Sequence, residues 1–199
     1  MFNNHIILST LCLSLVFGQY DYSLEDLNSS SEYYQQDVGT SFFEGEVTLH
    51  YFGHYNWGTC SARFGQLNDL YEDLISDGYD QVKLIGVGKS QHMNWLDNWT
   101  DDNDASVCAD GSGNPTWNNW GASQRDLFVL DYQGNLALHQ NVTSGLPFNL
   151  ESLVINLISQ IPADCNPDLA CGEAETCCDG LLFPTTCCAE NCDEPIGEC

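Results

Sequence analysis

Within residues 45–79 the spacing of the hydrophobic residues changes from that of a strand to that of a helix. The first part is a short run rich in β-branched and aromatic residues, which predicts a buried strand; it contains Val47, Leu49, Tyr51 and Phe52. The second part has apolar residues at three- and four-residue spacing, which predicts one apolar face of a helix; they are Phe64, Leu67, Tyr71, Leu74 and Ile75. Gly78 suits the position that follows a helix C-terminus, so we expect the helix to end there.

Three further elements follow from the same kind of pattern. Residues 81–88 predict a second strand, and a strand–helix–strand order implies a right-handed parallel crossover. Residues 127–130 and 135–138 predict a hairpin around Gly134, and residues 146–161 predict a last helix. Residues 89–126 are irregular and predict a long loop, with a short helix near Trp95 and a short strand at 106–108. This order predicts an α/β, thioredoxin-like fold, in which helices flank a central mixed sheet.

Cys60 falls where the first strand gives way to the helix. Backbone N–H groups and the helix dipole favour an anion at such a place, so a thiol there is a candidate redox group. Cys108 could pair with it, although sequence alone does not place the two within bonding distance. His50 and His54 flank the strand and could act on Cys60 or join it in a metal set, but the ligand spacing is not regular and two partly exposed histidines are the simpler interpretation.

A narrower resemblance is carried by the strand, the tetrapeptide Trp57-Gly58-Thr59-Cys60 and the helix that ends in Gly78-Tyr79. This arrangement is similar to the N-terminal domain of selenoprotein P, a secreted thioredoxin-like family, over roughly residues 40–160. The resemblance implies a redox pair whose second member is Cys60. The first, attacking member, which is selenocysteine or cysteine in that family, is replaced here by Trp57, so the motif is degenerate.

Two explanations of Trp57 remain open. In one, the site has truly lost its nucleophile, and an indole covers it instead. In the other, the codon specifies selenocysteine and is only translated here as tryptophan, which would leave a selenol able to bond with Cys60. The first explanation predicts no redox chemistry at position 57, and the second predicts a reactive selenol there.

An apolar run near the N-terminus and three glycosylation sequons indicate that the chain is exported. An apolar run at residues 6–17 predicts a signal peptide over 1–18, followed by an extended or partly disordered lead-in at 19–40 and the thioredoxin-fold domain at 41–162. Three sequons predict glycosylation at Asn28, Asn98 and Asn141. The protein is therefore expected to be secreted, with no membrane insertion once the signal is removed.

Residues 163–199 form a separate cysteine-rich module in this interpretation. A segment with so few apolar residues normally needs covalent cross-links to fold, so we predict four disulfides within it. Their pairing cannot be deduced from sequence. The cysteines are Cys165, Cys171, Cys177, Cys178, Cys187, Cys188, Cys192 and Cys199.

The net charge of −25 excludes nucleic acid as a partner, because neutralising phosphates needs many cations. The acidic loop from Asp97 to Asp110 could hold Ca²⁺, but it lacks the EF-hand order, and a solvated loop is the favoured interpretation. Its tryptophans could stack on a carbohydrate, although such residues more often cover the edge of a core. We predict no cofactor and no metal.

Three functions remain after these arguments. The favoured one is a secreted glycoprotein whose degenerate redox domain serves as a binding or structural scaffold for an extracellular protein or glycan. The first alternative is an extracellular thiol-disulfide or peroxide oxidoreductase that uses Cys60 with Cys108 or with a thiol of a partner. The second alternative is an extracellular matrix or carbohydrate-binding protein.

Overall fold

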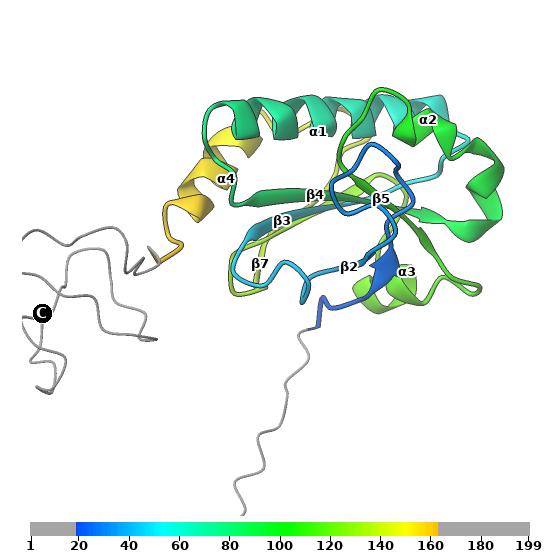
Figure 1. Ribbon diagram of the computed structural model, residues 1–199, viewed down its shortest axis with the longest axis horizontal. Helices are drawn as coiled ribbons and strands as arrows, with labels where there is room; N and C mark the ends of the chain where they lie inside the picture. The colour runs from blue at the N-terminus through cyan, green and yellow to red at the C-terminus, as the bar shows by residue number, and fades with distance from the viewer. Residues whose placement is uncertain (1–18, 163–199) are drawn as a thin grey trace, which may run out of the picture.

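A five-stranded mixed sheet organises the domain in the computed structural model, which describes residues 19–162 (Figure 1). The strand order is β5-β4-β3-β6-β7. The strands are β3 (Val47–Phe52), β4 (Val82–Lys89), β5 (Ser106–Asp110), β6 (Asp126–Leu130) and β7 (Leu136–Asn141). β3 pairs in parallel with β4 and β4 with β5, whereas β6 is antiparallel to both β3 and β7. The predicted parallel crossover and hairpin are both present.

β3 is the centre of the sheet, and its six residues are all buried. Successive side chains of a strand point to opposite faces, so β3 contributes to two cores. Leu49 and Tyr51 belong to the core beneath the long helices, while Phe52 belongs to the core on the other face. Because both faces of β3 are covered, even its polar residues Thr48 and His50 are buried.

Helices α1 (Gly58–Ser76) and α4 (Leu150–Ile158) cover one face of the sheet (Figure 1). Both confirm helices predicted from the three- and four-residue spacing, and α1 begins earlier than its first large apolar residue. Buried residues from both helices pack in one cluster with those of β3; they include Phe64, Leu67, Leu74, Val154 and Leu157. No helix among residues 19–162 is long and apolar enough to cross a bilayer.

The second face is covered by α3 (Pro115–Trp120) and by the segment predicted as a lead-in (Figure 1). This segment carries the paired two-residue strands β1 (Leu24–Glu25) and β2 (Asp37–Val38). Asp26 forms an isolated bridge with Cys108 of β5, and Val38 is fully buried. The lead-in is therefore packed as part of the domain rather than standing apart from it.

The stretch predicted as a long loop contains more regular structure than its sequence suggests. It holds the 3₁₀ helix η1 (Ser90–Trp95), α2 (Asp97–Thr100), β5 and α3. The short strand predicted at 106–108 is confirmed and extends to Asp110, but the prediction missed α3. Trp99, Trp117 and Trp120 are buried in the two cores, so tertiary packing stabilises these short elements where local periodicity does not. The predicted signal peptide and the cysteine-rich module lie outside the described residues.

Candidate functional site

Cys60 is buried in the first turn of α1. Its side chain has 0% exposure and packs in the core under α1 and α4. Its N–H donates to the carbonyl of Trp57 at 2.8 Å, and its own carbonyl accepts from the Tyr51 hydroxyl at 3.2 Å. The sequence prediction placed Cys60 at the right junction, but the sulfur does not reach the surface.

A loop far along the chain supplies the polar contacts of this sulfur. The Gln124 amide lies 3.3 Å from Cys60 Sγ, and Arg125 Nη1 lies 3.9 Å from it. Arg125 has a φ of +70°, a left-handed conformation that is uncommon for a residue other than glycine. Its N–H donates to the carbonyl of Phe52 at 2.7 Å, which ties the loop to the end of β3. Sequence analysis missed both residues because their proximity to Cys60 is purely tertiary.

Trp57 is the N-cap residue of α1 and is half exposed. Its ring centroid lies 6.0 Å from that of His54. An exposed indole therefore stands at the N-terminus of α1, three residues before Cys60. An indole neither ionises to a nucleophile nor forms a bond to sulfur, so Trp57 cannot perform thiol exchange.

His54 belongs to a group of rings next to Trp57 rather than to the sulfur site. Its ring centroid lies 4.7 Å from that of His92 and 5.7 Å from that of Trp117. Burial, together with the charges of His92, Lys89 and Arg125, lowers the pKa of His54 to about 4. His54 is therefore neutral at physiological pH.

His50 is fully buried and faces the opposite core, so the prediction of a partly exposed histidine near Cys60 is wrong for this residue. The Tyr22 hydroxyl lies 2.8 Å from Nδ1, and Thr48 Oγ1 lies 2.9 Å from Nε2. Burial lowers the pKa of His50 to about 3, which keeps the ring neutral. Among residues 19–162 no group of three or more histidine, cysteine or carboxylate side chains is arranged to hold a metal.

Cys108 does not pair with Cys60 in this part of the chain. Both thiols are free in the described residues, and they belong to the cores on opposite faces of the sheet. Burial raises the pKa of the Cys108 thiol, and the carboxylates of Asp26 and Asp37 raise it further. The possible pairing of Cys108 with Cys60 is therefore not seen in the described residues, where the sheet separates the two sulfurs.

The three sequons occupy different environments. Asn28 is fully buried, and its amide nitrogen donates at 2.8 Å to the carbonyls of both Asn103 and Ala105, so we do not expect a glycan on it in the folded domain. Asn98 is exposed and uses one amide hydrogen, in a 2.8 Å bond to a carbonyl. Asn141 is exposed, but its amide nitrogen donates to both the Gln124 carbonyl and the Asp126 carboxylate. Because a glycan replaces one amide hydrogen, Asn98 can accept one with the least rearrangement.

Comparisons with known proteins identify the fold. No family model and no curated protein matches the chain. A thioredoxin-family thiol:disulfide interchange protein from Chlorobium tepidum superposes with a TM-score of 0.53 at 11% identity, covering 70% of this chain and 94% of that one. DsbF of MTB has a TM-score of 0.53 at 17% identity, with 70% and 96% covered. A mitochondrial 2-Cys peroxiredoxin from Plasmodium falciparum has a TM-score of 0.53 at 17% identity, with 76% and 96% covered. The domain therefore has a thioredoxin-like fold.

Proposed function

We propose that this chain is a secreted glycoprotein whose thioredoxin-like domain is a binding or structural scaffold without thiol-exchange activity. The observation that carries the proposal is that Cys60 is 0% exposed, while the tryptophan three residues before it, where the resemblance places the attacking residue, is half exposed. The apolar run at residues 6–17 supports export, and the cysteine-rich residues 163–199 suit an oxidising compartment. The selenoprotein P-like order of elements around Trp57-Gly58-Thr59-Cys60 supports descent from a redox domain.

The chemistry of exchange explains why burial matters. A thiolate must approach a disulfide sulfur directly, form a bond to it and expel the other sulfur as a thiolate. Cys60 cannot make this approach while its sulfur is covered. Within residues 19–162 the other thiol is that of Cys108, and it cannot resolve a mixed disulfide on Cys60 because it lies across the sheet. The scaffold hypothesis follows from both obstacles together.

An oxidoreductase remains the second candidate, because two observations favour it. Gln124 and Arg125 place the N–H groups of an amide and a guanidinium at the sulfur, so Cys60 has polar neighbours as well as apolar ones. The structural neighbours also include thiol:disulfide interchange proteins and a peroxiredoxin. In this alternative the sulfur becomes accessible through movement of the 121–125 loop, and an external thiol resolves the mixed disulfide.

Insulin reduction by the full secreted chain, with dithiothreitol as electron donor, separates the two candidates. We expect the wild-type protein and the Cys60→Ser variant to show the same rate, equal to the background. Trp57→Cys is the matched gain-of-function control, because it restores a two-cysteine motif at the N-terminus of α1. Wild-type turnover that Cys60→Ser abolishes would overturn the scaffold proposal.

The few basic residues of the chain make a direct test of Trp57 straightforward. Arg63 is the first basic residue, so one tryptic peptide that ends there holds both Trp57 and Cys60. We expect the mass of this peptide to match tryptophan. A selenium isotope pattern in it would show a selenol at position 57 and would make the domain an enzyme.

Alkylation of the native protein tests accessibility in the same peptide. Cys60 should react with iodoacetamide only after unfolding, because its sulfur is covered in the native state. Rapid labelling of native Cys60 would favour the oxidoreductase.

A further inference from the structure

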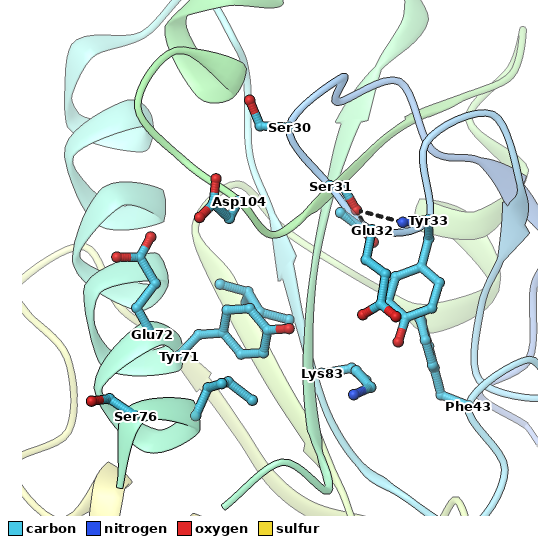
Figure 2. A pocket seen from close by; sticks show the side chains of 13 residues that line it. Ser30, Ser31, Glu32, Tyr33, Phe43, Tyr71, Glu72, Ser76, Lys83 and Asp104 are labelled. Carbon is cyan, nitrogen blue, oxygen red and sulfur yellow. Dashed lines mark hydrogen bonds between the residues drawn. The ribbon is translucent and has the colours of Figure 1, made fainter. Parts of the chain in front are cut away.

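A cavity of about 410 Å³ lies between the C-terminal half of α1, the packed lead-in and β4 (Figure 2). It is remote from the sulfur site, since Tyr71 lies eleven residues along α1 from Cys60, or about 16 Å at the helical rise. This volume is within the range of small-molecule sites. Its polar and aromatic lining includes Ser30, Tyr33, Tyr71, Glu72, Lys83 and Asp104.

Two tyrosines form the aromatic walls. Figure 2 shows the Tyr71 ring, from α1, and the Tyr33 ring, from the lead-in, entering the same space from opposite sides. Phe43 and Leu84 close the apolar wall and are almost fully buried. The faces of aromatic rings attract cations, and ammonium groups are commonly held between such rings.

The single lysine of the cavity is already neutralised. Lys83 Nζ lies 3.2 Å from the Glu46 carboxylate and 6.0 Å from the centroid of Tyr33. Its side chain is only 13% exposed. Burial alone would lower the pKa of Lys83, but Glu46 and the two tyrosines together raise it, so the ion pair is maintained. Lys83 therefore offers little to an anionic ligand.

The three carboxylates that line the cavity have no cationic partner within the described residues. They are those of Glu32, Glu72 and Asp104, and all three residues are exposed. The Glu72 carboxylate accepts a hydrogen bond from Asn68, which holds it in place. The chain as a whole carries a net charge of −25, which adds to the attraction of cations to a concave site. Charge and aromatic walls thus favour the same kind of ligand.

We propose that this cavity binds a small organic ammonium ion. The Tyr33 and Tyr71 rings contact the alkyl groups and attract the charge, and the three free carboxylates supply long-range attraction. The apolar wall receives the uncharged part of the ligand. The site is independent of Cys60, so it stands whether or not the domain catalyses thiol exchange.

Calorimetric titration of the full chain with choline tests this proposal, with 3,3-dimethyl-1-butanol as the control. The control has the same shape and hydroxyl but carbon in place of the charged nitrogen. We expect saturable binding of choline, at least tenfold weaker binding of the alcohol, and weakening of choline binding as salt rises. Equal affinities for the two compounds, or no saturation by choline, would overturn the proposal.

Variants locate the site. Tyr71→Leu and Glu32→Gln should each weaken choline binding at least fivefold, while Tyr71→Phe should retain it because the ring remains. Tyr34→Leu is the matched control, since Tyr34 is an exposed tyrosine outside the cavity lining. Thermal unfolding of each variant checks that it is folded. Unchanged binding by folded Tyr71→Leu would refute the assignment of the ligand to this cavity.

The ammonium group could belong to a free molecule or to a lipid headgroup. Flotation of the protein with phosphatidylcholine vesicles distinguishes these sources. Vesicle binding that Tyr71→Leu abolishes would support the cavity with a headgroup as ligand, and choline binding without vesicle binding would support it with a free ligand. Vesicle binding that persists in Tyr71→Leu, with no choline binding, would contradict the proposal.

Discussion

Replacing Asn28 with alanine should destabilise the domain strongly. The side-chain amide of Asn28 donates to the backbone carbonyls of Asn103 and Ala105, both at 2.8 Å, and is itself fully buried. Asn28→Ala removes both bonds to these buried carbonyls, together with the bond that the Asn28 side-chain oxygen accepts from the Ser30 N–H. An unsatisfied buried group costs about 1–3 kcal/mol, so we expect the free energy of unfolding to fall by about 2–4 kcal/mol. That loss is a large part of the stability of a typical domain.

Urea unfolding followed by tryptophan fluorescence measures this loss. Ser30→Ala is the matched control, because it destroys the same sequon and leaves the Asn28 side chain in place. Its unfolding free energy should differ from wild type by less than about 0.5 kcal/mol, as for an exposed surface change. The tryptic peptide ending at Arg63 holds this sequon alone, so its mass also reports whether Asn28 is glycosylated. A glycan there, or a loss below about 1 kcal/mol in Asn28→Ala, would refute the reasoning.

Two further predictions concern the cores. Gly88→Ala should destabilise the domain by about 1–3 kcal/mol or more, because an added Cβ would lie 2.1 Å from a ring carbon of Tyr55. Gly111→Ala is the control, because its added Cβ meets nothing within 4 Å. Equal unfolding free energies for the two variants would contradict the prediction. The pKa of His50 is about 3 in the folded state and 6.5 in the unfolded state, so the unfolded state binds more protons between these values. His50 therefore lowers the free energy of unfolding as the pH falls from about 6.5 towards 3. The unfolding free energy of His50→Gln should therefore fall less than that of wild type between pH 7 and pH 4, and parallel pH profiles would show the inference to be incorrect.

The parts of the fold that sequence predicted are those with long, regular patterns. β3, β4, the hairpin of β6 and β7, and the helices α1 and α4 each carry enough consecutive positions for a period to show. The two-residue strands β1 and β2 carry too few, and so does α3, whose six residues make less than two helical turns. β1, β2 and α3 exist because Val38, Trp117 and Trp120 pack into the second core, and that information is tertiary.

For the candidate site, the sequence predicted the position of Cys60 but not its surroundings. Cys60 was located because a strand-to-helix junction is a local feature. Its burial, and its contacts with Gln124 and Arg125, depend on a loop more than sixty positions away, which no local pattern reports. Tyr71 was assigned to the apolar face of its helix, and only its hydroxyl group could have indicated a more polar environment. The lead-in that provides Tyr33 shows no periodicity at all.

Burial gives Cys60 a packing role that explains its presence without a redox partner. A free thiol behaves as a small apolar side chain, and Cys60 fills space in the core where α1 meets β3. Gln124 and Arg125 also contact Sγ from the adjacent loop. The same loop is held to β3 by a 2.7 Å bond from the Arg125 N–H to the carbonyl of Phe52, which a movement of the loop backbone away from β3 would break. The N-terminal end of α1 is thus closed by structure, whereas its C-terminal half opens onto a cavity with charged and aromatic walls. Ligand binding is therefore a more direct use of this scaffold than thiol exchange.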